Sequence, residues 1–277
     1  MDLQDVRPKS QAELLFEAQL RRDRRFRANV AITWIVLVLI LAVMFSGNSS
    51  LPFGIGGIKL DSGFIAENWS FIAKGISSTI GISILSIILA TLLALFAALG
   101  RLSTFPPFFA ISTFYVSLIR GTPLYLQIFF FFLALPQLGI ILPGMWAGVL
   151  ALGLNYGAYM SEIFRAGLAA VGKGQREAAM AIGMTARQTM TRIVLPQALR
   201  FAIPPTGNEF IAMTKDSALV SATGFVHELM WRATKVGRAH FRNLEALIIA
   251  AVFYWIVTLI LTALQSRLEA RMSKGDR

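Results

Sequence analysis

The chain has 277 residues, of which 56% are hydrophobic and 15% charged, and its mean hydropathy is +0.64. Soluble globular domains carry about 25% charged residues, so this composition excludes a soluble fold and indicates a membrane protein with several helices. The absence of cysteine excludes disulfides and thiolate metal sites, and a net charge of +11 is typical of a membrane protein with basic cytoplasmic segments.

The chain begins with a basic segment, residues 1–29, which contains the run RRDRRFR. We predict that this segment is cytoplasmic and binds anionic membrane lipid. An apolar stretch at residues 30–46 follows and predicts a first transmembrane helix. Residues 47–74 begin with many glycines and serines and are predicted as a periplasmic loop.

A transmembrane domain is predicted at residues 75–266, followed by a cytoplasmic tail at residues 267–277. Each of its five stretches is long enough to cross about 30 Å of hydrocarbon. The five stretches are Ile76–Leu99, Pro107–Leu135, Met145–Phe164, Ile203–Ala222 and Ala246–Leu264. They follow Val30–Phe45, the first span, which makes six in all. The fold class is therefore predicted as an all-α integral membrane protein with about six transmembrane helices.

The third span contains Arg120, followed by the helix breakers Gly121 and Pro123. A broken membrane helix frees backbone groups and commonly faces the cavity of a transporter. Arg120 therefore either holds the break in shape or binds the carboxylate of a substrate. Thr122 and Gln127 are candidate hydrogen-bonding members of the same cavity.

Residues 167–200 form a polar hairpin between the fourth and fifth spans. The pattern predicts a short helix at Gln175–Ile182, a break at Gly183 and a capping box at Thr185 that begins a second helix. We expect the second helix to end before Pro196. The pattern approaches a DNA-binding helix-turn-helix. Its inward positions are polar and both of its ends continue into membrane spans, so nucleic acid is excluded as a partner.

The fifth span carries a cluster of polar groups within nine residues, Asn208, Glu209, Lys215 and Asp216. Met213 lies one turn from Glu209 and shares its face. A charged group at membrane depth costs ~2.5–3.5 kcal/mol on insertion scales, so each needs a partner or a role. Glu209 either meets a cationic group of a substrate or pairs with Arg120 or Lys215, and both interpretations stay open.

The lysines and arginines give the orientation. The six-span topology places 18 of the 26 on one side and 6 on the other, with Arg120 and Lys215 inside the membrane. Because cytoplasmic loops collect basic residues, both termini and the hairpin are predicted to be cytoplasmic. Gly224–Phe241 is predicted as an interfacial helix on the outer side, with Leu229, Trp231 and Val236 at the lipid boundary.

The hairpin resembles the EAA motif of ATP-binding-cassette importer permeases. Glu177, Ala178 and Ala179 are followed at the family's spacing by Gly183 and by Ile193-x-Leu195-Pro196. The segments RGTPLYLQ, YGAYMSEIFRAGL, LPQALRFAIPPTGNEF and KDSALVS resemble the branch that imports polar amino acids: histidine, glutamine, arginine, glutamate and opines. The resemblance covers roughly Lys74 to Met272.

The resemblance implies a type I permease core of five helices, with the first helix here as an extra one. It implies a second permease subunit, two copies of an ABC ATPase, a periplasmic solute-binding protein and an amino acid substrate, in the bacterial inner membrane. Glu177, Ala178, Ala179 and Gly183 would contact the ATPase, which would bind ATP and magnesium. This chain would bind no cofactor and catalyse no reaction. The transported amino acid and the identity of the second permease subunit stay open.

An ion-coupled secondary transporter is the alternative function. It would also use Arg120, Glu209 and Asp216, but such transporters commonly show internal repeats, and the sequence shows none. A metal site is not expected, because the two histidines, His227 and His240, lie thirteen positions apart without further ligands beside them.

Overall fold

The computed structural model describes residues 11–44 and 60–272, so most of the predicted periplasmic loop and part of the tail lie outside the described residues. The described residues are helical apart from short connections and contain no strand, which confirms the all-α prediction. The chain divides into two units, residues 1–62 and 63–277. The helices are α1 (Gln11–Met44), α2 (Ser62–Ala73), α3 (Gly75–Arg101), α4 (Pro106–Arg120), α5 (Leu124–Phe129), η1 (Phe130–Ala134), η2 (Leu135–Leu138), α6 (Gly144–Ala170), α7 (Lys173–Ala181), α8 (Ala186–Thr189), η3 (Met190–Val194), α9 (Leu195–Asp216), η4 (Ser217–Thr223), α10 (Leu229–Ala239) and α11 (Asn243–Met272).

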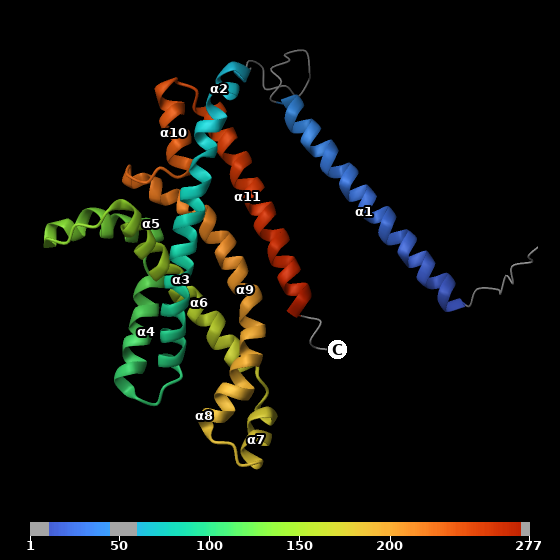
Figure 1. The fold of residues 1–277 in the computed structure, drawn as a ribbon, viewed down its shortest axis with the longest axis vertical. Coiled ribbons are helices and arrows are strands. Elements are labelled where there is room, and N and C mark those ends of the chain that lie inside the picture. Colours follow the sequence, from blue (N-terminus) through green and yellow to red (C-terminus); the bar gives the residue numbers. More distant parts are fainter. Residues whose placement is uncertain (1–10, 45–59, 273–277) are drawn as a thin grey trace, which may run out of the picture. The chain divides into compact units, whose positions relative to one another are not determined.

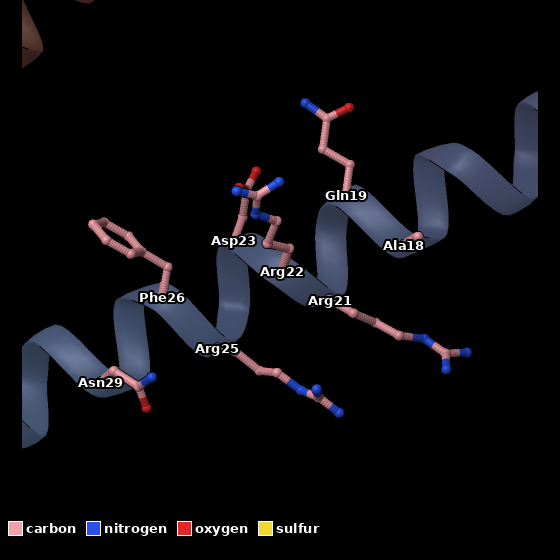
Figure 2. A pocket seen from close by; sticks show the side chains of 8 residues that line it. All are labelled: Ala18, Gln19, Arg21, Arg22, Asp23, Arg25, Phe26 and Asn29. Carbon is pink, nitrogen blue, oxygen red and sulfur yellow. The ribbon is translucent and has the colours of Figure 1, made fainter.

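The first unit contains α1, a single helix of 34 residues that joins the basic segment to the first predicted span without a break. At about 1.5 Å per residue it is roughly 50 Å long. Figure 2 shows the side chains of Arg21 and Arg25, one turn apart, extending from the same side of the helix. Residues 11–29 of the basic segment are therefore a helical extension of the apolar span.

The core of the second unit lies where α6 packs between α3 and α9. Small residues allow the close approach of α6 and α3. A Cβ atom at Gly153 would lie 2.6 Å from Cδ2 of Leu89, and one at Gly157 would lie 2.9 Å from Cβ of Leu93. Glycines spaced by four on one helix are a common contact in membrane helix pairs.

The predicted break in the third span is confirmed. The chain bends by 103° between Pro106–Arg120 and Leu124–Leu138, as Figure 1 shows at the junction of α4 and α5. Pro123 precedes α5 as its N-cap residue. The residue before a proline is disfavoured from the α region, so Thr122 and Pro123 direct the chain out of α4.

Two helices on the predicted outer side differ from the expectation. Ser62–Ala73, predicted as loop, forms α2, which is separated from α3 by Lys74 alone. The prediction that Leu229 faces lipid is wrong, because its side chain is completely buried in a second cluster with Ile72 and Ala246. The helix α10 packs on α3 and α11, so its apolar face is used inside the unit.

The prediction that the second hairpin helix ends before Pro196 is also wrong. A π turn, η3, links α8 to α9, and Pro196 lies in the first turn of α9. Pro196 has no N–H to donate to the preceding turn, so one helical hydrogen bond is lost there while the backbone stays helical. The helical backbone therefore runs from Ala186 to Asp216.

Hydropathy alone identifies fewer spans than predicted. Among the described residues, two helices are long and apolar enough to cross a membrane, Ser62–Arg101 and Asn243–Met272, and the bent pair at residues 106–138 would make a third. The helices α6 and α9 carry polar side chains that pack inside the unit, which lowers their hydropathy. A count of six therefore stays a prediction.

Candidate functional site

A polar pocket lies at the break in the third span. It has a volume of about 630 Å³. Its lining residues come from the end of α4, the break, α6 and α9, and they are Arg120, Gly121, Thr122, Pro123, Leu124, Asn155, Tyr156, Tyr159, Glu209 and Asp216. The volume is in the range of small-molecule sites, about 300–1,000 Å³.

The α9 side of the pocket is acidic. Glu209 and Asp216 lie seven residues apart, which is two helical turns, so both face the pocket. The Tyr156 hydroxyl donates a hydrogen bond of 2.8 Å to Oδ2 of Asp216, which fixes that carboxylate against α6. No ion pair to Glu209 was found within the part of the chain that the structure describes, whereas the sequence left pairing with Arg120 or Lys215 open.

Arg120 supplies the basic side of the pocket. Its guanidinium lies 5.1 Å from the centre of the Tyr159 ring, and its Nη1 lies 3.3 Å from Oε1 of Glu162. Arg101 also donates to Oε1 of Glu162, and Nε of Arg165 lies 2.9 Å from Oε2. One carboxylate outside the pocket lining thus joins three arginines from α3, α4 and α6.

The break itself is held by a hydrogen-bonded network. The buried amide of Gln127 donates to the carbonyl of Ile119 at 2.9 Å, and to the carbonyl and hydroxyl of Thr122 at 3.1 and 2.9 Å. It accepts a hydrogen bond of 3.2 Å from the Asn155 amide on α6. Gln127 therefore replaces the helix hydrogen bonds lost at the break, while Thr122 lines the pocket.

Three predicted pathway residues lie elsewhere. Met213 is completely buried in the main core, and Lys215 is exposed outside the pocket lining. Asn208 accepts a hydrogen bond of 3.1 Å from Gln265 on α11. The positions of Asn208 and Lys215 follow from helix geometry, because residues adjacent to Glu209 or Asp216 point about 100° away from the pocket face. Met213 lies one turn from Glu209, and its side chain packs in the core instead of lining the pocket.

The contribution of α6 to the site was not among the sequence predictions. Asn155, Tyr159 and Glu162 occur at spacings of four and three, which puts them on one helical face. That spacing is a polar stripe inside a predicted span and was visible in the sequence. The long-range pairing of Glu162 with Arg120 was not visible, because it depends on how α4 packs against α6.

The hairpin of residues 167–200 is the second candidate site. Its break at Gly183 is confirmed, with φ of +80°. The N–H of Gly183 donates to the carbonyl of Met180 and that of Met184 to the carbonyl of Ala179, at 2.9 and 3.0 Å. This pair of hydrogen bonds is a Schellman motif, which favours glycine at the left-handed position.

The predicted capping box is confirmed as well. The backbone N–H of Gln188 donates to Oγ1 of Thr185 at 3.3 Å, and the backbone N–H of Thr185 donates to Oε1 of Gln188 at 2.9 Å. Both ends of the turn between α7 and α8 are thus fixed by local hydrogen bonds.

The hairpin is attached to both neighbouring long helices. The guanidinium of Arg176 donates a hydrogen bond of 2.8 Å to the carbonyl of Leu168, in the last turn of α6. Leu168 also packs with Val171, Val194 and Ala198 in a small buried cluster between α6 and the η3–α9 segment. The hairpin is therefore anchored to both α6 and the η3–α9 segment.

The exposed surface of α7 includes part of the predicted contact set. Glu177, Ala178 and Gly183 are exposed, whereas Ala179 is only 4% exposed and packs inside the chain. Ile182 is 78% exposed and was missed by the sequence analysis. Met180, at 59% exposed, adds a second apolar side chain to the same part of the hairpin.

A hollow along α1, lined by the eight residues labelled in Figure 2, is not a candidate substrate site. Its residues run from Ala18 to Asn29 on a single helix, so the hollow has no opposite wall that could enclose a ligand. Sites for small molecules bury most of the ligand surface.

Comparison with known proteins supports the resemblance to importer permeases that the sequence motifs indicate. Residues 90–274 match the family model described as binding-protein-dependent transport system inner membrane component. The chain is 42% identical over 220 residues to an arginine transport system permease protein of Bacillus subtilis, which covers 79% of this chain and 100% of the relative. It is 36% identical over 203 residues to a glutamine transport system permease protein of Escherichia coli, which covers 72% of this chain and 91% of the relative.

Solved structures are similar in fold. An amino acid ABC transporter crystallised with histidines matches with a TM-score of 0.73 and 37% identity, over 77% of this chain and 99% of the solved chain. An inward-facing methionine ABC transporter matches with a TM-score of 0.62 and 16% identity, over 73% of this chain and 96% of the solved chain, and supports the fold alone.

Proposed function

Because the chain belongs to the family of binding-protein-dependent transport system inner membrane components, we propose that it is the permease subunit of an ATP-driven amino acid importer. The chain forms the translocation path. It couples ATP hydrolysis on a separate ATPase to alternation between outward-facing and inward-facing states.

The observation that carries the coupling proposal is the construction of the hairpin. Its turn is fixed by a Schellman motif and a capping box, and Arg176 and a buried apolar cluster attach it to α6 and α9. A flexible loop could not transmit displacement, whereas this element can. We assign the ATPase contact to Glu177, Ala178, Gly183 and the neighbouring Ile182, and we assign Ala179 to packing of α7 against its own chain.

The charges of the pocket support an amino acid as the substrate. Arg120 offers donors to an α-carboxylate, and Glu209 and Asp216 offer acceptors to an amino group. With two carboxylates and one guanidinium in the lining, a substrate with one carboxylate and two cationic groups balances the charge. A cationic amino acid such as arginine therefore fits better than a zwitterion, in agreement with the name of the related arginine transport system permease protein of Bacillus subtilis.

The proposed assembly follows the family. It contains a second permease subunit, two copies of an ABC ATPase that bind ATP and magnesium, and an extracytoplasmic solute-binding protein. The distribution of basic residues supports a bacterial inner-membrane location with the hairpin and both termini in the cytoplasm. The arginines of α1 would then lie beside anionic lipid headgroups.

The test is substrate-stimulated ATP hydrolysis by the complex reconstituted in proteoliposomes. Glu177→Lys and Gly183→Trp should abolish most of the stimulation, because one reverses a surface charge and the other forces a bulky side chain into a left-handed position. Glu67→Lys, a charge reversal on exposed α2, is the matched control and should leave it unchanged. Normal stimulation in both hairpin variants would refute the coupling role.

A further inference from the structure

Glu162 contacts the pocket residue Arg120 without lining the pocket itself. We propose that Glu162 is a positioning residue that orients Arg120 toward the carboxylate of the substrate. The inference rests on the proposed function, because it assigns a purpose to Arg120 in the same pocket.

Without contacts to its neighbours, the Arg120 side chain would be free to adopt many rotamers. Arg120 is the last residue of α4, directly before the break, and its side chain is 42% exposed. A long side chain at a helix end loses considerable rotamer entropy when it binds a ligand in one geometry. Contacts that hold it in place before binding reduce this loss.

The helix α6 contacts the Arg120 guanidinium through two side chains. Tyr159 and Glu162 are three residues apart and share a face, so the ring and the carboxylate contact the same guanidinium. A planar guanidinium can stack on a ring and donate in its own plane at the same time, which an ammonium cannot do. The two contacts therefore restrict both the position and the tilt of Arg120.

These contacts leave Arg120 able to donate hydrogen bonds to a substrate. Glu162 also accepts from Arg101 and Arg165, so its charge is shared among three guanidiniums. Its contact with Arg120, at 3.3 Å, is longer than its contact with Arg165, at 2.9 Å. A guanidinium has five N–H donors, and the hydrogen bond from Arg120 to Glu162 uses one of them, which leaves others for a substrate.

The charge balance gives the same conclusion. Three arginines around one carboxylate leave a net positive cluster beside a pocket whose other wall is acidic. Removing Glu162 would increase the electrostatic repulsion between Arg101 and Arg120. It would also remove the carboxylate contact that holds the Arg120 side chain in position. Recognition of a carboxylate should weaken although the pocket lining is unchanged.

The experiment compares the affinity of the assembled transporter, in detergent and without the binding protein, for arginine and for agmatine, which lacks the carboxylate. Titration calorimetry gives the ratio of the two dissociation constants. We expect the wild type to prefer arginine by about tenfold or more, the effect of a hydrogen-bonded charge pair. Arg120→Gln and Glu162→Gln should each reduce the preference to less than about threefold.

The controls separate positioning from folding. The ratio does not depend on the fraction of folded protein. Arg165→Gln removes another partner of the same carboxylate without touching Arg120, and it should leave the preference intact. Glu162→Asp retains the charge and should restore part of the preference, so it also serves if Glu162→Gln does not fold. The double variant Arg120→Gln/Glu162→Gln should equal Arg120→Gln alone.

The outcomes distinguish the two proposals. A wild type that does not prefer arginine, or an unchanged preference in Arg120→Gln, overturns the proposed substrate pocket. Loss of preference in Arg120→Gln together with full preference in Glu162→Gln and Glu162→Asp overturns only the positioning role. Additive losses in the double variant would show that Glu162 does not act through Arg120.

Discussion

Gly183 and Phe241 both have a left-handed backbone conformation, which glycine adopts more easily than phenylalanine. Gly183 follows α7 and Phe241 follows α10, both at positive φ, +80° and +54°. In each case the next residue, Met184 or Arg242, donates to the carbonyl five residues earlier. Both are Schellman motifs, but only the first has the glycine that this conformation favours.

We predict that Gly183→Ala destabilises the protein and that Phe241→Gly stabilises it, each by about 1 kcal/mol. Phe241 is 92% exposed, so its replacement removes little packing. Thermal unfolding of the purified protein in detergent measures both effects. A lower midpoint for Phe241→Gly would show that its ring stabilises the fold by a contact outside the chain.

A second prediction concerns a buried carboxylate. Glu228 is completely buried and caps α10, accepting from the backbone N–H of Met230 and of Trp231 and from the Tyr254 hydroxyl. Burial raises the pKa of Glu228, and the hydrogen bonds from Tyr254 and the two backbone N–H groups oppose this effect. A carboxyl whose pKa is raised on folding stabilises the fold fully below its unfolded pKa of about 4.3, and this stabilisation is lost as the pH rises through the higher folded pKa.

The attachment of α10 should therefore be more stable in mild acid than at neutral pH. Hydrogen exchange of the α10 backbone, measured between about pH 4 and pH 7 and corrected for intrinsic rates, tests this. Glu228→Gln cannot titrate and should flatten the dependence. An equal slope in the variant would assign the pH effect to another group.

At the scale of helices, the approach of α3 and α6 depends on glycine. We predict that Gly157→Val destabilises the unit by roughly 3 kcal/mol, because a Cβ there would lie 2.8 Å from the Tyr115 hydroxyl and 2.9 Å from Leu93. Gly157 belongs to α6, whereas Gly81 belongs to α3; a Cβ at Gly81 meets no atom within 4 Å, so Gly81→Ala should stabilise α3 by up to about 1 kcal/mol. Urea or thermal unfolding in detergent compares the pair, and equal effects would contradict the packing argument.

Sequence patterns predicted the local features of these helices well. The break after Arg120, the turn at Gly183 and the cap at Thr185 each depend on a few adjacent residues. The end of the second hairpin helix at Pro196 was predicted wrongly, because a π turn before a proline has no simple local signature. Non-local pairing also escaped prediction: Glu162 with Arg120, and Leu229 with the α3–α11 surface.

For the whole molecule, hydropathy was a weaker guide than polarity within the spans. Glu209 and Asp216 lower the hydropathy of α9, and they are also what mark it as the wall of a pocket. The sequence therefore predicted the charged wall of the site but not which neighbours of Glu209 face away from it. That distinction needed the rotation of α9 against α6, which the packing of the core sets.

The division into two units leads to a prediction for the whole chain. The family match begins at residue 90, and 79% of this chain covers the full length of a relative. We therefore expect deletion of residues 1–59 to leave the second unit folded and the reconstituted complex active. Membrane insertion, thermal stability and substrate-stimulated ATPase activity test this. Loss of folding on this deletion would show that the second unit needs α1.

The π turn at η3 has one mechanical consequence. Because it continues the helix, the 31 residues from Ala186 to Asp216 form one continuous helical segment about 46 Å long, with Pro204 and Pro205 inside it, that connects the hairpin to the two pocket carboxylates. Under the proposed function, displacement of the hairpin by an ATPase would change the positions of Glu209 and Asp216 relative to Arg120. The coupling element would then act on the substrate pocket directly.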